Sequence, residues 1–181
     1  MIGGEVAHRA VAEYGCCQDP EELSLLLGIV TAMHPELIVE IGCNTGGSLY
    51  AWAQTGAEVI GVTLGPHDPN DTCDPHGATL IHGDSHHVAI MDKLEKELDG
   101  RRPDFFFIDG DHSEAGCRSD WMLAQRVHAK AVGFHDISHR RVPGDPGVRK
   151  VFGEACAKYP SVTIRNPADL MNPGAGIVWL T

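Results

Sequence analysis

The stretch DFFFIDGDH, residues 104–112, runs from a block of large apolar residues directly into two carboxylates and an imidazole. A continuous apolar run without alternation is typical of a strand that is buried on both faces, as in a parallel sheet. Carboxylates that follow such a strand must stay hydrated or find a partner. The stretch therefore predicts a buried strand that ends at a polar edge, where a ligand can bind.

The rest of the chain repeats this alternation between apolar runs and helical segments. Further strands are predicted at residues 37–41, 58–62, 78–82 and 131–136. Helices are predicted at 20–34 with Asp19 as cap, at 46–54, at 85–98 with Ser85 as cap, at 114–128, and from Asp145 and Pro146 to 156. The runs at 161–165 and 174–180 have no helix between them, which indicates an antiparallel hairpin. We predict an α/β fold with a doubly wound, mostly parallel seven-stranded sheet of the Rossmann-like type and an antiparallel C-terminal hairpin.

Length and composition narrow the class of protein. A chain of 181 residues fits one domain, 1–181, in which residues 1–18 form an N-terminal extension before the first firm helix. The formal net charge of −11 argues against a nucleic-acid partner. No apolar run is long enough to span a membrane, and the first residues do not resemble a secretory signal, so we expect a cytoplasmic protein. No insertion forms a lid, which leaves the pocket open or completed by a second subunit in a homo-oligomer.

Polar residues follow every strand of the predicted parallel core at the same edge. They are the segment Glu40–Asn44, Thr63, the segment Gly83–Ser85, the segment Asp109–His112, and the pair His135–Asp136. In open α/β sheets, ligands bind in the crevice beyond the carboxyl ends of the strands. A sheet built for stability alone has no need to collect carboxylates there. We therefore predict a ligand pocket.

The turn in VEIGCNTGGS, residues 39–48, fits two patterns. Gly42, Asn44 and Gly47 form a degenerate version of the glycine motif that cradles the pyrophosphate of dinucleotides. Thr63 then stands where the ribose-binding acid of such enzymes is expected. In the other pattern, Glu40, Gly42, Asn44 and Gly46 follow the spacing E-x-G-x-G-x-G. The whole order of polar clusters then resembles a class I S-adenosylmethionine-dependent methyltransferase.

The later motifs narrow this resemblance. IDGDHSEAGCRSDW at 108–121, GFHDI at 133–137 and PGVRKVF at 146–152 resemble the small O-methyltransferase family that includes cephalosporin-hydroxylase-type and macrocin-type enzymes. The resemblance covers about residues 20–181. It implies a Rossmann-like methyltransferase fold, S-adenosylmethionine as cofactor, and a divalent metal, Mg or Mn, as a possible second cofactor.

The resemblance also assigns roles near the acidic motif. It implies that Asp109 is a metal ligand, Asp111 the base beside the substrate hydroxyl, and Asp136 a second metal ligand. Two residues within these later motifs depart from the family pattern: His135 replaces a frequent acid, and Glu114 stands where Tyr is common. A histidine at 135 favours manganese, iron or zinc over magnesium. It is equally suited to act as a catalytic base without metal.

Cofactor contacts follow from position along the strand ends. Backbone amides from Gly42 through Asn44 to Gly46 suit the methionine carboxylate, and Glu40 suits the amino group. Thr63 is expected near the ribose, Asp84 and Ser85 near the adenine, and Asp109 beside the cofactor as well. Ser85 has a simpler alternative role as a helix cap alone.

These observations predict an S-adenosylmethionine-dependent O-methyltransferase that acts on a small molecule with a hydroxyl group. An alternative enzyme is an NAD- or nucleotide-sugar-binding Rossmann protein. A third alternative is a catalytically inactive protein that retains the cofactor pocket, because Thr63, His135 and Glu114 depart from the family pattern. Fold-level analogy does not identify the acceptor.

Overall fold

The computed structural model describes residues 2–65, 72–138, 147–166, 168–169 and 173–180. Within these ranges, seven strands form one sheet in the order β3-β2-β1-β4-β5-β7-β6. They are β1 (Leu37–Ile41), β2 (Glu58–Thr63), β3 (Thr79–His82), β4 (Phe105–Ile108), β5 (Ala131–Phe134), β6 (Ser161–Ile164) and β7 (Ala175–Trp179). Strands β3, β2, β1, β4 and β5 are mutually parallel, whereas β7 is antiparallel to β5 and β6. The predicted fold class, including the C-terminal hairpin, is confirmed.

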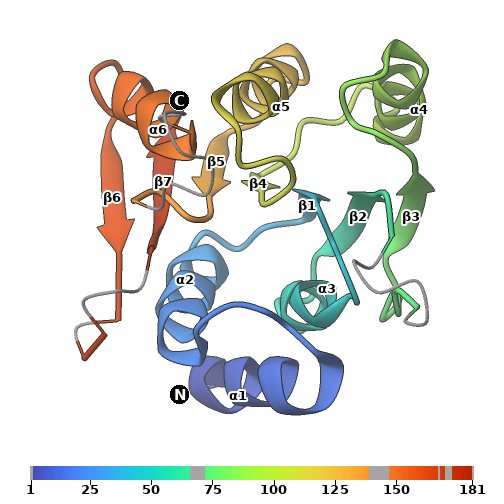
Figure 1. The fold of residues 1–181 in the computed structure, drawn as a ribbon. Helices are drawn as coiled ribbons and strands as arrows, with labels where there is room; N and C mark the ends of the chain where they lie inside the picture. Colours follow the sequence, from blue (N-terminus) through green and yellow to red (C-terminus); the bar gives the residue numbers. More distant parts are fainter. Residues whose placement is uncertain (1, 66–71, 139–146, 167, 170–172, 181) are drawn as a thin grey trace.

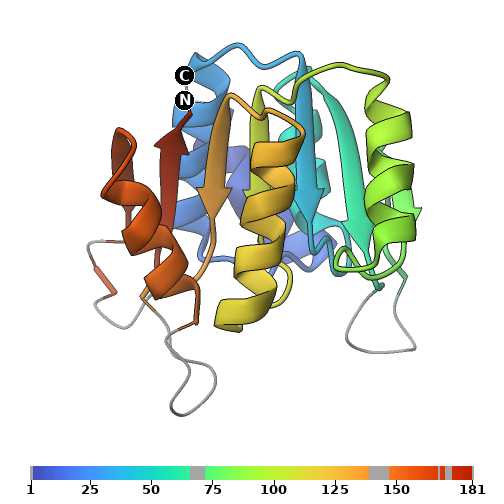
Figure 2. The same ribbon diagram turned by 90° about the horizontal axis from the view of Figure 1, so that it is seen from above.

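Helices cover both faces of the sheet (Figure 1). On one face lie α1 (Ile2–Tyr14), α2 (Pro20–Ala32) and α3 (Gly47–Ala53); on the other lie α4 (Val88–Leu98), α5 (Glu114–Arg126) and α6 (Gly147–Cys156). A buried apolar cluster fills the space between each helix layer and the sheet. Figure 2 shows the parallel strands pointing toward one edge and β7 pointing the other way. The loops that follow the parallel strands therefore share that edge, where α/β sheets bind ligands.

Strand β4 lies at the centre of the sheet between β1 and β5. Phe105 and Phe107 pack into the cluster beneath α1–α3, whereas Phe106 and Ile108 pack into the cluster beneath α4–α6. Full burial of one such side chain stabilises a fold by roughly 1.5–3 kcal/mol. The strand is thus held from both sides, and it gives the following Asp109 a fixed starting point.

The helix starts confirm one predicted cap and correct another. Asp19 caps α2 as predicted, because its Oδ1 accepts hydrogen bonds from the amides of Glu21 and Glu22, each at 3.0 Å. The prediction that Ser85 caps the next helix is wrong: α4 begins at Val88 with His87 as its N-cap. The Ser85 hydroxyl instead donates to Asp120 on α5. Asp145 and Pro146, expected to open α6, lie outside the described residues.

Helix α1 lies within residues 1–18, the segment predicted to be an N-terminal extension. Its buried residues are the small or medium apolar side chains Val6, Ala7 and Ala10, which pack with α2 and α3 residues. Small side chains and the early Gly3 and Gly4 give a weak helical signal. No helix in the described part of the chain is both long and apolar enough to cross a membrane.

Candidate functional site

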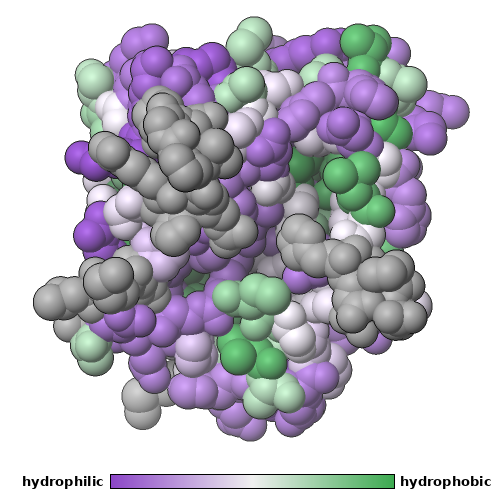
Figure 3. Space-filling view, viewed as in Figure 1, coloured by the Kyte–Doolittle hydropathy of each residue, from purple (hydrophilic) through white to green (hydrophobic). Residues whose placement is uncertain are grey.

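A cavity of about 460 Å³ lies at the carboxyl edge of the parallel strands. Its lining includes many of the predicted site residues: Gly42, Asn44, Thr63, Asp84, Ser85, Asp109, Asp111 and His135. Glu40, Gly46 and Asp136 were also predicted for the site, but they lie outside this lining. The surrounding face is mostly hydrophilic, with small separate hydrophobic groups (Figure 3). The sequence prediction and the cavity therefore point to the same edge of the sheet.

The turn after β1 has backbone angles that explain its composition. Gly42 and Gly46 both have a φ of 94°, and Asn44 has a φ of 46°. A Cβ atom on Gly42 would collide with the carbonyl of Asp109, and one on Gly46 with the carbonyl of Asp74. Asparagine is one of the few residues that readily adopt the left-handed region. Asn44 therefore keeps the turn that the glycine pattern would require at this position.

Glu40 lies beneath the turn and is fully buried. Burial raises the pKa of this carboxyl to about 8, against smaller lowering effects from Ser48 and Trp52. Asp109 raises it further by charge repulsion. A carboxyl in this state holds its proton near neutral pH unless a cation approaches it. An amino group bound at the turn would supply that cation.

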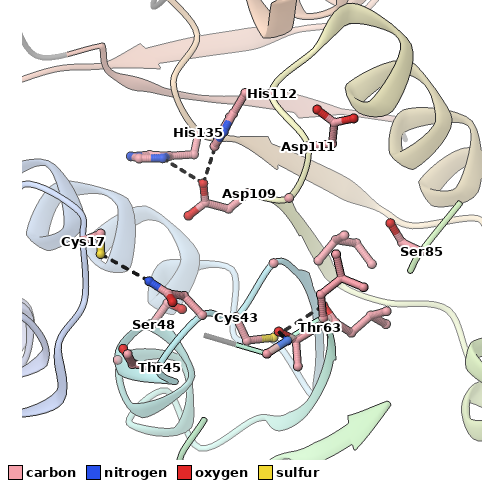
Figure 4. A pocket seen from close by; sticks show the side chains of 18 of the residues that line it. Cys17, Cys43, Thr45, Ser48, Thr63, Ser85, Asp109, Asp111, His112 and His135 are labelled. Carbon is pink, nitrogen blue, oxygen red and sulfur yellow. Dashed lines mark hydrogen bonds and ion pairs between the residues drawn. The ribbon is translucent and has the colours of Figure 1, made fainter. Parts of the chain in front are cut away.

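The densest polar cluster forms around Asp109, directly after β4. His135 Nδ1 lies 2.9 Å from Asp109 Oδ1, and His112 Nε2 lies 3.1 Å from the same oxygen (Figure 4). One ligand atom from each of these three residues lies within 4.8 Å of the other two, which is close enough for a shared metal ion. Asp136 stands next to both imidazoles, with oxygens 3.4 Å from His135 Nδ1 and 3.6 Å from His112 Nε2.

The contacts within the cluster shift the pKa values of Asp109 and His135 in opposite directions. Burial alone would raise the pKa of Asp109, but the charge of His135 and hydrogen bonds from His112 and His135 hold it below its usual range. Burial alone would lower the pKa of His135, but Asp109, Asp136 and Glu22 raise it to about 9. At neutral pH His135 is therefore an imidazolium, and it is poorly suited to act as a free base.

Two residues with no predicted role in the site, Gln18 and Glu22, also reach the cluster. Gln18 is 5% exposed and lines the cavity, and its Nε2 donates to Asp109 Oδ2 at 3.1 Å. Glu22 on α2 is 1% exposed and places Oε1 3.6 Å from His135 Nε2. The loop before α2 and the first turn of α2 thus each contribute one side chain to the cluster. Because α2 precedes every strand of the sheet, only folding brings these residues to Asp109.

Asp111, the predicted base, lines the cavity but stands apart from the two histidines (Figure 4). Its Oδ1 accepts from the Ser113 amide at 2.8 Å, and its Oδ2 accepts from the Ser113 hydroxyl at 3.0 Å. Ser113 is in turn the N-cap of α5 and accepts from the amide of Gly116. Asp111 therefore has a structural role at the start of α5, whatever its role in catalysis.

The loops after β2 and β3 form the other end of the cavity. The buried Thr63 hydroxyl accepts from the amide of Gly65, and Asp84 Oδ1 accepts from the amide of His86 at 2.9 Å. Ser85 donates its hydroxyl hydrogen to Asp120 Oδ1 at 2.8 Å. This end of the cavity is thus distinct from the cluster around Asp109.

Among the site residues that were not predicted, one had a recognisable sequence motif. His112 belongs to the DGDH stretch, and its position three residues after Asp109 let it reach back to that carboxylate. Gln18 and Glu22 gave no signal beyond their position at a helix start, and Asp120 looked like one polar residue of an amphipathic helix.

Comparison with known proteins gives one family and several structural relatives. The sequence model of the family described as rhamnosyl O-methyltransferase/CmcI matches residues 7–127. Ribosomal RNA large subunit methyltransferase E from Nitrosomonas eutropha is 30% identical over 118 residues, which are 64% of this chain and 54% of that protein. The chain thus spans about half the length of this curated relative.

Two solved structures illustrate the fold. MycE methyltransferase from the mycinamycin biosynthetic pathway, in complex with Mg and SAH (S-adenosylhomocysteine), superposes with a TM-score of 0.68 at 13% identity, over 98% of this chain and 54% of that one. An O-methyltransferase from Bacillus cereus, in complex with SAH, gives 0.64 at 14% identity, over 99% and 90% of the two chains. At these identities the likeness establishes a common fold.

Proposed function

We propose that this chain, which belongs to the rhamnosyl O-methyltransferase/CmcI family, transfers a methyl group from S-adenosylmethionine to the hydroxyl of a small molecule. The family membership confirms the predicted family, and the matched residues 7–127 include the DGDH motif, whereas GFHDI and PGVRKVF lie beyond them. The observation that carries the proposal is that one cavity extends from the glycine turn after β1 to the acidic cluster after β4. A methyl donor and its acceptor need such a shared space.

The cofactor is proposed to occupy the turn and the ends of β2 and β3. Gly42, which lines the cavity, is proposed to bring its backbone close to the methionine part, while Asn44 and Gly46 hold the turn in its left-handed conformation. The cofactor's ammonium group would favour ionised Glu40, whose buried carboxyl otherwise holds its proton. Thr63 is proposed for the ribose, and Asp84 with Ser85 for the adenine. Asp109, at the junction, faces both cofactor and acceptor.

The reaction is an in-line displacement, so the enzyme mainly aligns an oxygen with the methyl carbon. The acceptor oxygen forms a bond to that carbon while the carbon–sulfur bond breaks. The electron pair of the broken bond remains on sulfur, which leaves as the neutral thioether SAH. The hydroxyl proton must pass to a base, since a neutral hydroxyl is a poor nucleophile.

The cluster has a donor set that fits a divalent metal. Asp109, His112 and His135 converge with one ligand atom each, and Asp136 adds negative charge beside them. When bound, a metal would act as a Lewis acid that makes the acceptor hydroxyl easier to deprotonate. Two imidazoles and a carboxylate suit manganese, iron or zinc better than magnesium, which prefers oxygen ligands. The imidazolium at 135 must lose its proton before it can bind a metal.

The base is proposed to be Asp111, whose carboxylate lines the same cavity. His135 is less suited, because its two ring nitrogens face Asp109 and Glu22. In a reaction without metal, His112 would be the better base, with Asp109 as the carboxylate that orients its ring. Dependence of turnover on metal separates these two mechanisms.

The acceptor is proposed to be a small molecule rather than a nucleic acid. The relative from Nitrosomonas is named for ribosomal RNA, but the net charge of −11 in this chain disfavours a phosphate backbone. The alternative of NAD or a nucleotide sugar is disfavoured by the family match and by Asn44, which stands where the dinucleotide motif has the glycine that lets the backbone approach the pyrophosphate.

Calorimetric titration with SAH, in the presence of Mn²⁺ and again with EDTA, tests the proposal. We expect micromolar binding in both conditions, because the metal donors lie at the acceptor end of the cavity. NAD and UDP-glucose serve as matched control ligands and are expected to give no heat. Binding of NAD without binding of SAH would reject the methyltransferase. SAH binding without turnover on any acceptor in a hydroxyl-compound screen would favour the inactive cofactor-binding protein.

A further inference from the structure

Asp120 on α5 is a buried acid outside the proposed reaction machinery. Its side chain is completely buried, and its Oδ2 has no hydrogen-bond partner among the described residues. Burial raises the pKa of Asp120 to about 6, against the lowering effect of a hydrogen bond from Ser85. Burying a carboxylate with a free oxygen is unfavourable, so such a group at a cavity wall points to a function.

Asp120 lies directly behind the wall of the cavity. Ser85 and His86 line the cavity, and both contact Asp120 Oδ1: the Ser85 hydroxyl at 2.8 Å and His86 Nε2 at 3.6 Å. A Cβ atom on Gly110, a third lining residue, would approach Asp120 Oδ2 to 3.4 Å. Asp120 therefore acts on a ligand only through the residues in front of it.

The hydrogen bond to Asp120 determines whether the Ser85 hydroxyl can donate to a ligand or only accept from it. A serine hydroxyl has one hydrogen and two lone pairs, and the carboxylate takes the hydrogen. Only lone pairs remain for the cavity. The neighbouring Asp84 carboxylate is likewise an acceptor. In Figure 4, Ser85 lies on the side of the cavity away from His112 and His135. Ser85 and Asp84 thus present acceptors at this end of the cavity, and these suit a ligand group that donates.

We propose that Asp120 is a positioning residue that holds Ser85 as a hydrogen-bond acceptor, so that the cavity selects a 6-amino purine over a 6-oxo purine. The inference rests on the proposed function, in which Asp84 and Ser85 meet the adenine. The exocyclic amine of a 6-amino purine can donate a hydrogen bond to the Ser85 oxygen. A 6-oxo group would instead place its own acceptor oxygen next to the acceptor oxygen of Ser85. Leaving such groups unpaired lowers affinity by about tenfold to a hundredfold.

The test compares the affinities of SAH and S-inosylhomocysteine, its 6-oxo analogue, by calorimetry. We expect the wild type to prefer SAH by at least about tenfold. Asp120→Asn can donate an amide hydrogen to Ser85 and release the hydroxyl hydrogen toward the cavity, so the preference should fall at least about fivefold. Ser85→Ala should lower the preference as well. Asp92→Asn makes the same charge change at an exposed position of α4 and should leave the preference for SAH unchanged.

The outcomes are separable. If Asp120→Asn weakens both ligands equally, Asp120 is structural only and the inference is wrong. The same holds if the wild type binds both ligands alike. If the wild type binds neither, the proposed function fails and the inference fails with it. Circular dichroism and thermal melts show whether each variant is folded, and Ser85→Ala keeps the test valid if Asp120→Asn does not fold.

Discussion

Gln18 and Asp109, 91 residues apart in the sequence, are joined by a hydrogen bond of 3.1 Å from Gln18 Nε2 to Asp109 Oδ2. The other oxygen of Asp109 is engaged by His112 and His135. The amide thus orients the carboxylate so that one oxygen stays directed at the histidines. Residues of this kind tune a metal site from outside its ligands.

The first prediction concerns this bond. Gln18→Leu keeps the volume but removes the donor, so Asp109 is free to rotate. We expect Mn²⁺ affinity to fall about tenfold or more, because loss of an outer-shell partner typically has this effect. SAH affinity should change less than about threefold, since the substitution leaves the glycine turn and the ends of β2 and β3 unchanged. Calorimetry measures both, and Gln125→Leu on the exposed side of α5 is the control. Unchanged Mn²⁺ affinity would contradict the role.

A second prediction concerns the kind of metal. Because two imidazoles converge with Asp109, Mn²⁺ or Zn²⁺ should bind at least about tenfold more tightly than Mg²⁺. EDTA should abolish turnover and leave SAH binding intact. His112→Ala should weaken metal binding, whereas His87→Ala, with a side chain 74% exposed, should not. If turnover survives EDTA but not His112→Ala, His112 is the base and no metal takes part.

The role of Asp111 requires a control for its structural contacts. Asp111→Asn should lower kcat about a hundredfold, which is typical for loss of a general base, with SAH affinity unchanged. It also disturbs the start of α5, where Asp111 accepts two hydrogen bonds from Ser113. Ser113→Ala loses the N-cap, at about 1 kcal/mol of stability, but keeps the carboxylate. Equal loss of kcat in both variants would mean that Asp111 has only a structural role.

Glu40 should make the free energy of unfolding depend on pH. Its pKa is raised from 4.5 to about 8 in the folded chain. Between these values the folded state holds one proton more than the unfolded state, so stability falls as pH rises. The slope is at most about 1.4 kcal/mol per pH unit. Glu40→Gln should flatten this slope in urea unfolding from pH 5 to pH 8, whereas the exposed control Glu97→Gln should not.

Binding of SAH provides a second test of the protonation state of Glu40. If the cofactor's ammonium group ionises Glu40, binding at pH 7 releases a proton. Titrations in buffers of different ionisation enthalpy detect this proton, and Glu40→Gln should remove it. Parallel slopes in wild type and Glu40→Gln, together with no proton release, would contradict the raised pKa.

Much of the fold was predictable because its signals are local. The apolar run Phe105–Ile108 and its polar end at Asp109 required only hydrophobicity and strand length. The cap at Asp19 required one side chain and two nearby amides. The start of α4 was mispredicted because Ser85 had two possible partners. One possible partner was an amide in the next helical turn, which is close along the chain. The partner that Ser85 has in the structure, Asp120, lies 35 residues away and is not visible from local sequence.

The sequence by itself determined the sheet, the edge at which the polar residues collect, and the family. These follow from apolar periodicity and from motifs whose residues are close along the chain. Only the tertiary structure decided which groups meet: Gln18 with Asp109, Glu22 with His135, and Ser85 with Asp120. Such contacts depend on how helices dock on the sheet. That docking is set by the packing of both cores together, and no single stretch of sequence encodes it.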